Sequence, residues 1–202
     1  MSSGPQRIDF FDKLPSLPSV VAAAGLAAPY ISPERHGRPF SMILVVTRRC
    51  NSRCKMCFIW QEKKSPMLSL DQYRQIFREP LPSIRALALS GGEPTLRADL
   101  AEIWAIARPA LPRLEYGLLA TSGLNVQRTL DHVEKIMQQI ERDPGRMKWF
   151  EVQVSLDGID ETHDHVRGIA GFFTRVQRTL AGLAELRQRF PLLKPKLSSV
   201  VL

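Results

Sequence analysis

Short apolar runs recur along the chain from residue 41 onward, separated by longer amphipathic stretches. Runs of five or six residues bounded by turn-forming or charged residues are typical of β-strands. The predicted strands are 42–47, 84–89, 115–120, 150–154 and 197–202. The first run is continuously apolar, which is the pattern of a strand that is buried on both faces.

Between these runs, apolar residues return at spacings of three and four, which indicates α-helices. Ser69 and Gln72 form a capping box, and Tyr73, Ile76 and Phe77 follow it at helical spacing. Further helices are predicted at 100–107, 130–140 and 172–189. The apolar face of the helix at 130–140 consists of Val133, Ile136, Met137 and Ile140.

This alternation of strands and helices predicts an α/β fold with a parallel sheet and right-handed crossovers. Residues 1–40 are rich in proline and alanine and are interpreted as an N-terminal leader with room for one short helix. Residues 41–202 then form the regular domain. In such folds ligands bind at the carboxyl ends of the strands.

Four unusual loops follow the first four predicted strands. They are 50–57 with its three cysteines, 90–94 (Ser-Gly-Gly-Glu-Pro), 121–123 (Thr-Ser-Gly) and 155–158 (Ser-Leu-Asp-Gly). Because the carboxyl ends of parallel strands share one edge of the sheet, these four loops are expected to converge.

All three cysteines of the chain lie in the first of these loops, in a Cys-x3-Cys-x2-Cys pattern. Thiolates select iron–sulfur clusters, zinc or copper(I) over hard ions. A cubane iron–sulfur cluster normally takes four cysteines, so three would leave one iron free to bind a small molecule. The flanking cations Arg48, Arg49, Arg53 and Lys55 favour thiolates.

Other uses of the cysteines stay open at this point. A structural zinc site needs a fourth ligand, and each histidine is at least fourteen positions from the nearest cysteine. A disulfide framework fits an odd count poorly. The stretch His163-Asp164-His165 lacks an evident third ligand and is interpreted as loop structure rather than a metal site.

Composition narrows the class of protein. A chain of 202 residues with 44% hydrophobic and 24% charged residues fits one sizeable globular domain. It has no run of about 20 apolar residues and no secretory signal, so a cytoplasmic protein without membrane contact is expected. The net charge of +8 is scattered along predicted helices without an RNA-binding signature, so a nucleic-acid partner is not expected.

Taken together, these motifs resemble the radical SAM superfamily. The match consists of the three cysteines, Gly91-Gly92-Glu93-Pro94 and Ser155-Leu156-Asp157-Gly158, and it covers about 41–202. The stretch from Ser155 to Phe173 is similar to the branch whose members often carry a SPASM-type extension, such as peptide maturases. The resemblance implies a partial (β/α) barrel of six units, of which about five are present here.

The resemblance also implies cofactors and an activity. Cys50, Cys54 and Cys57 would hold a [4Fe–4S] cluster whose open iron binds S-adenosylmethionine. One electron from a donor such as flavodoxin or ferredoxin would then yield a 5′-deoxyadenosyl radical that abstracts hydrogen from a peptide or small molecule, an oxidoreductase-type reaction. The alternative is a non-catalytic iron–sulfur or zinc-binding fragment or partner subunit.

Individual S-adenosylmethionine contacts follow from the same resemblance. Gly91 and Gly92 would let the backbone approach the ligand, and Glu93 would bind its ammonium group rather than cap the helix near Ala98. Ser155 would bind the ribose and Arg167 the carboxylate. Asp157 is either a ligand contact or part of an ordinary turn.

The chain departs from the family pattern in three places. Met56 and the adjacent Phe58 stand where an aromatic residue usually covers the adenine. Thr-Ser-Gly at 121–123 replaces the common Thr-Asn-Gly. The sequence also ends within the fifth predicted strand, which is expected of a fragment, a truncated product or one half of a split protein.

Overall fold

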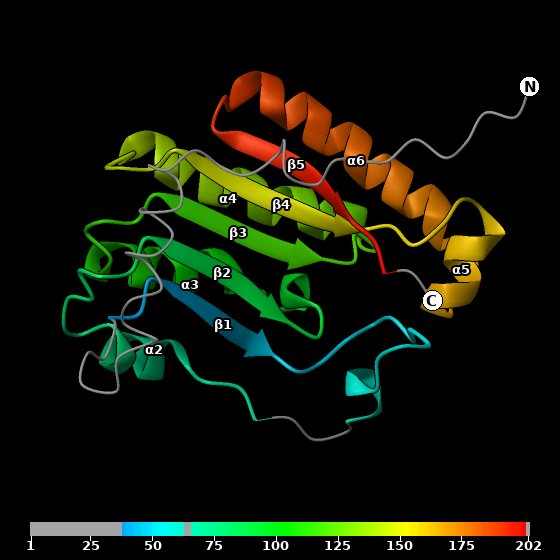
Figure 1. The fold of residues 1–202 in the computed structure, drawn as a ribbon, viewed down its shortest axis with the longest axis horizontal. Helices are drawn as coiled ribbons and strands as arrows, with labels where there is room; N and C mark the ends of the chain where they lie inside the picture. The colour runs from blue at the N-terminus through cyan, green and yellow to red at the C-terminus, as the bar shows by residue number, and fades with distance from the viewer. Residues whose placement is uncertain (1–37, 63–65, 201–202) are drawn as a thin grey trace, which may run out of the picture. The chain divides into compact units, whose positions relative to one another are not determined.

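The computed structural model describes residues 38–62 and 66–200, which form a five-stranded parallel sheet (Figure 1). The strands are β1 (Ser41–Thr47), β2 (Ala86–Gly91), β3 (Tyr116–Thr121), β4 (Trp149–Ser155) and β5 (Leu193–Ser198). Each strand pairs with the next one along the chain, in the order β1-β2-β3-β4-β5. The predicted parallel α/β fold is therefore confirmed.

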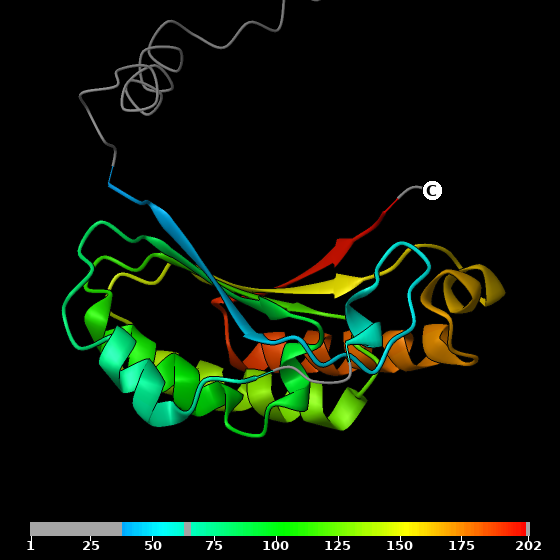
Figure 2. The ribbon, with the colours of Figure 1, turned by 90° about the horizontal axis from the view of Figure 1, so that it is seen from below.

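Helices α2, α3, α4 and α6 all cover the same face of the sheet, as Figure 2 shows, while α5 lies beyond the strand ends. Their bounds are α2 (Leu70–Ile76), α3 (Leu100–Ala107), α4 (Val126–Arg142), α5 (Glu161–Arg167) and α6 (Phe172–Arg189). Short 3-10 turns occupy Ile59–Gln61, Pro94–Leu96 and Arg108–Ala110. The predicted capping box of Ser69 and Gln72 is present at the start of α2.

The core lies between the sheet and these helices. Alternate strand residues such as Leu89, Leu119 and Phe150 are fully buried there, and each contributes roughly 1.5–3 kcal/mol through burial. Trp104 packs edge-on against Phe150 with ring centroids 5.2 Å apart. Gly117 makes this possible, because a Cβ there would overlap the Phe150 ring.

The opposite face of the sheet is not covered by any helix in residues 38–62 and 66–200. Ile43 and Val45 point to that side and are 68% and 57% exposed. The expectation that the first strand is buried on both faces is therefore wrong for β1. The physical reason is that helices cover only one face of β1, an edge strand, so the side chains on its other face stay exposed.

Several boundaries differ from the sequence-based expectation: α4 begins at Val126 rather than 130, and β2 ends at Gly91 rather than 89. The fifth strand spans Leu193–Ser198 rather than 197–202, because Lys194 and Lys196 interrupt the apolar pattern while the backbone still pairs with β4. Pro195 lacks an N–H donor and is tolerated because β5 is an edge strand. Helix α5 has no counterpart among the predicted elements.

The expected leader at 1–40 lies outside the described residues except for 38–40, and 201–202 lie outside them too. Within the described part of the chain, no helix combines the length and apolar character needed to cross a membrane.

Candidate cofactor-binding site

A cavity of about 290 Å³ lies at the carboxyl ends of the strands, where the four unusual loops meet. All three cysteines line it, together with residues that follow β2, β3, β4 and β5. Of the other residues singled out from the sequence, Gly91, Gly92, Ser155 and Arg167 line the cavity, whereas Glu93 and Asp157 do not. The predicted convergence of the loops is therefore observed.

The three thiols are free and differ in their surroundings. Cys54 is buried, and Cys50 and Cys57 are half-buried. Burial raises the pKa of the Cys50 and Cys54 thiols. At Cys54 the Arg167 guanidinium opposes this rise in pKa, since its Nη1 lies 3.5 Å from the sulfur. A cation this close stabilises the thiolate.

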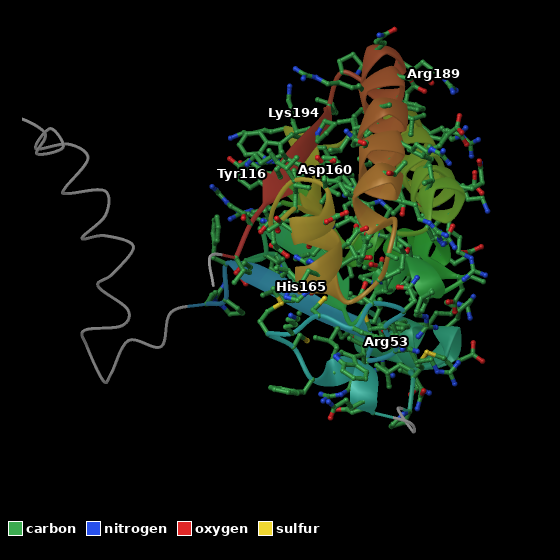
Figure 3. All side chains as sticks on the ribbon, turned by 90° about the vertical axis from the view of Figure 1, so that its right-hand side faces the viewer. Arg53, Tyr116, Asp160, His165, Arg189 and Lys194 are labelled. Carbon is green, nitrogen blue, oxygen red and sulfur yellow. The ribbon has the colours of Figure 1, made fainter. Side chains whose placement is uncertain are left out.

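The cysteine loop is held by the end of helix α5. The N–H of Arg53 donates to the carbonyl of Arg167 at 3.0 Å, and the N–H of Lys55 donates to that of Val166 at 3.0 Å. The Lys55 ammonium also contacts the His165 ring. Figure 3 shows this helix beside the loop, with His165 and Arg53 labelled. We call these two backbone hydrogen bonds the α5 clamp.

Gly168 ends helix α5 and allows the clamp to form. It adopts φ = 72°, a left-handed conformation that glycine adopts without strain. A Cβ at this position would lie 2.5 Å from the carbonyl oxygen of Arg53. No pattern in the sequence indicates this contact, because a glycine at position 168 does not by itself identify Arg53 as its neighbour.

The two glycines after β2 approach the backbone of the cysteine loop closely. The N–H of Gly92 donates to the Thr47 carbonyl at 2.8 Å. A Cβ on Gly91 would overlap the Thr47 oxygen, and one on Gly92 would overlap that of Arg49. These glycines therefore pack two loops together in addition to lining the cavity.

Glu93 is 1% exposed, and protein donors surround its carboxylate. Oε1 accepts from the Thr95 N–H and from the hydroxyls of Thr95 and Thr121, at 2.7–3.2 Å. Oε2 accepts from the Ser122 N–H at 2.7 Å and its hydroxyl at 2.5 Å. Glu93 thus joins the loop after β2 to the loop after β3, directly behind the cavity wall.

As expected, Glu93 does not cap the helix near Ala98, because Asp99 is the N-cap residue of α3. Its side chain instead caps the 3-10 turn Pro94–Leu96, which precedes α3. The residues it contacts, Thr121 and Ser122, line the cavity themselves. The sequence marks them only as part of an unusual Thr-Ser-Gly loop.

Asp157 lies behind Arg167 rather than on the cavity. Its side chain is fully buried, and its Oδ2 accepts from the Arg167 Nε at 2.5 Å. Its backbone N–H donates to the His163 Nδ1 at 3.1 Å. His163 is fully buried too, and this burial lowers the pKa of its imidazole.

The stretch His163-Asp164-His165 is part of helix α5, so its interpretation as a loop is wrong. The three side chains have separate roles. Asp164 accepts from the N–H groups of Gly171 and Phe173 at the start of α6, which lowers the pKa of its carboxyl. His163 supports Asp157, and His165 contacts Lys55.

Met56 lines the cavity, together with Ile59. Phe58 is 71% exposed and does not line it. Of the two candidates for an apolar contact beside the cysteines, Met56 is therefore the one in position.

The donor set suits a polynuclear cluster better than a single ion. Among the residues that the structure describes, no three His, Cys, Asp or Glu side chains gather closely enough to hold one metal ion. In a cubane cluster each cysteine binds a different iron, so its ligands are spread around a cavity. Three thiols that line a common cavity fit this requirement.

The comparisons with known proteins point the same way. A family model described as "Radical SAM superfamily" matches residues 44–194. The Fe-coproporphyrin III synthase of Methanosarcina barkeri is 33% identical over 145 residues, which are 69% of this chain and 33% of that protein. The sporulation killing factor maturation protein SkfB of Bacillus subtilis is 28% identical over 149 residues, with coverages of 73% and 33%.

A solved structure, "Native anSMEcpe with bound AdoMet", is similar in fold. Its TM-score is 0.53 at 23% identity, and the match covers 79% of this chain and 43% of that one. The expected partial barrel is therefore shown. The chain spans about a third of the length of the two curated relatives.

Proposed function

Because this chain belongs to the radical SAM superfamily, we propose that its core at 41–202, after a leader at 1–40, binds a [4Fe–4S] cluster and S-adenosylmethionine. Cys50, Cys54 and Cys57 are the proposed cluster ligands. The observation that carries the proposal is that all three thiols line one cavity together with the polar ends of the neighbouring strands.

The chemistry supplied by these cofactors when bound is reductive cleavage of S-adenosylmethionine to a 5′-deoxyadenosyl radical that removes a hydrogen atom from a substrate. The protein's own task is to bind, orient and shield the reacting groups. Gly91 and Gly92 present backbone to the cavity without side chains in the way. Ser155, at the end of β4, offers a hydroxyl to the ribose.

Glu93 acts through the cavity wall in this proposal. Its carboxylate orients the hydroxyls of Thr121 and Ser122, which line the cavity. The side chains of Thr121 and Ser122 separate its negative charge from the cavity, and from there the charge attracts the ammonium group of the ligand. Met56 supplies the apolar contact next to the adenine.

The substrate is a peptide or a small molecule with polar groups. The relatives include a synthase of an iron porphyrin and a peptide maturation protein, so the likeness alone supports both classes. On the uncovered face of the sheet, Gln153 pairs in register with the cavity-lining Ala120. Two residues earlier on β4, Glu151 is buried and forms an ion pair with Lys196 at 2.5 Å. This surface suits a polar substrate.

The electron donor is an acidic protein such as flavodoxin or ferredoxin. Arg49, Arg53 and Lys55 flank the cysteines and are exposed. Within the described residues neither Arg49 nor Arg53 forms an ion pair, so both are available to an acidic partner.

Anaerobic reconstitution with iron and sulfide tests the proposal. The protein is expected to bind about four irons per chain, to change its reduced-state paramagnetic resonance signal when S-adenosylmethionine is added, and to release 5′-deoxyadenosine with dithionite. Replacing Cys50, Cys54 or Cys57 with Ala should abolish cluster assembly, whereas Met56→Leu, next to Cys57, should retain the iron.

Two other outcomes would change the conclusion. Stoichiometric zinc with no capacity to assemble a cluster would contradict the proposal. A cluster that binds S-adenosylmethionine without any cleavage would favour the non-catalytic partner subunit instead.

A further inference from the structure

Cys54 is the thiol that contacts a half-buried cation, Arg167. The Nη1 of Arg167 donates to the Cys54 sulfur at 3.5 Å. Among the described residues, Cys50 accepts a single hydrogen bond, from the backbone N–H of Ser52 at 3.4 Å. In the described part of the chain the Cys57 sulfur accepts no hydrogen bond. The three sulfur atoms are therefore electrostatically unequal.

The position of Arg167 is fixed by a chain of contacts. Its side chain is 11% exposed and forms an ion pair with Asp157, whose side chain is fully buried. The other oxygen of Asp157 accepts from the Val200 N–H at 2.9 Å. The Nδ1 of His163 accepts a hydrogen bond from the backbone N–H of Asp157. A guanidinium held this firmly loses little additional freedom when it donates to a sulfur.

The backbone of Arg167 also belongs to the α5 clamp, because its carbonyl accepts from the Arg53 N–H, next to Cys54. Main chain and side chain of this one residue thus act on the same part of the cysteine loop. A contact with S-adenosylmethionine alone would not require this arrangement.

We propose that Arg167 is a positioning residue for Cys54: it donates a hydrogen bond to the ligating sulfur and raises the reduction potential of the cluster. This inference rests on the proposed function. Reduction adds one electron and makes the cluster and its thiolates more negative. A donor with a positive charge at the sulfur stabilises that reduced state, since hydrogen bonds to the sulfurs and local charge set such potentials.

The test is a redox titration of the reconstituted cluster without S-adenosylmethionine, followed by paramagnetic resonance. Arg167→Met should make the midpoint more negative by about 59 mV, a tenfold change in the equilibrium constant of a one-electron couple. Arg167→Lys keeps the positive charge but loses the planar guanidinium. Its midpoint potential should lie between those of the wild type and Arg167→Met. Arg187→Met, an exposed arginine near the end of α6, controls for net charge and should match the wild type.

Each outcome has a defined meaning. Equal midpoint potentials in the wild type and both Arg167 variants overturn the inference. This holds even if the variants bind S-adenosylmethionine with a different affinity. If Arg167→Met assembles no cluster, Arg167→Lys decides: a more negative midpoint supports the inference and an unchanged one overturns it. A wild type that assembles no cluster overturns the proposed function, and this inference with it.

Discussion

The backbone N–H of Arg53 donates to the carbonyl of Arg167 at 3.0 Å, although the two residues belong to segments far apart in the domain sequence. The contact joins the middle of the cysteine loop to the last turn of α5. It therefore makes the shape of the cysteine loop depend on a helix that carries none of the cysteines.

Gly168→Ala should disrupt this contact. The substitution places a Cβ 2.5 Å from the Arg53 oxygen and imposes a left-handed conformation that costs about 1–2 kcal/mol. Gly171→Ala is the matched control, since Gly171 has nearly the same φ of 73° but an added Cβ there meets nothing within 4 Å. Both variants should lose stability in urea unfolding, and Gly168→Ala should also lose bound iron after reconstitution. Equal iron in the two variants would contradict a role for the clamp.

Glu93→Gln should destabilise the fold by roughly 1–3 kcal/mol, the range for losing hydrogen bonds to a buried charged group. Gln replaces one carboxylate oxygen with an NH2 group, so the side chain can no longer accept from both the Thr121 hydroxyl on one side and the Ser122 N–H on the other. Urea unfolding measures this change, with Glu102→Gln on the exposed face of α3 as control. Affinity for S-adenosylmethionine should fall as well, and unchanged values of both would rule out this role of Glu93.

Stability should decrease as the pH falls below about 6.5, the ordinary pKa of histidine. Burial lowers the pKa of His163 and of His132 in the folded state, so the unfolded chain binds more protons over this range. The stabilisation is fully present above pH 6.5 and is lost as the pH falls through the lowered value.

His163→Asn isolates one of these groups, since an amide oxygen can still accept from the Asp157 N–H. Its unfolding free energy between pH 8 and 5 should depend less on pH than that of the wild type. Parallel profiles for the two proteins would show that His163 does not contribute.

Reversing charge beside the cysteines should slow electron delivery. In the double variant Arg49→Glu, Arg53→Glu, reduction by flavodoxin should be slower and less sensitive to salt, because charge pairs steer association. Reduction by dithionite and the iron content should stay comparable. Arg113→Glu, an exposed position before β3, controls for charge reversal away from the site. Equal slowing in Arg113→Glu would place the donor elsewhere.

Local patterns predicted most of the fold, because helix and strand periodicity is set by which face each element buries. Helices α3 and α6 begin and end where the sequence placed them. The prediction failed where long-range contacts override the pattern. Lys194 and Lys196 lie on an uncovered face of β5, so the apolar signal shifted to later residues.

The residues of the candidate site also fall into those that the sequence predicts and those that only the structure reveals. The cysteines and glycines have recognisable spacing and do converge on one cavity. Glu93 and Asp157 also belong to recognisable motifs, but the sequence does not indicate their partners, because Ser122 and Val200 lie far from them in the chain. Only the folded structure shows that they contact the residues around the cavity rather than line it.

The α5 clamp also sets an order of events during synthesis. Cys54 lies 113 positions before Arg167, so a ribosome releases the cysteine loop long before the helix that holds it. Contacts between such distant segments form late in folding, after the entropy of closing the intervening loop has been overcome. The nascent loop therefore meets the cell's metals and oxidants with its thiols unrestrained, and it reaches its final shape only when β4 and α5 have joined the sheet.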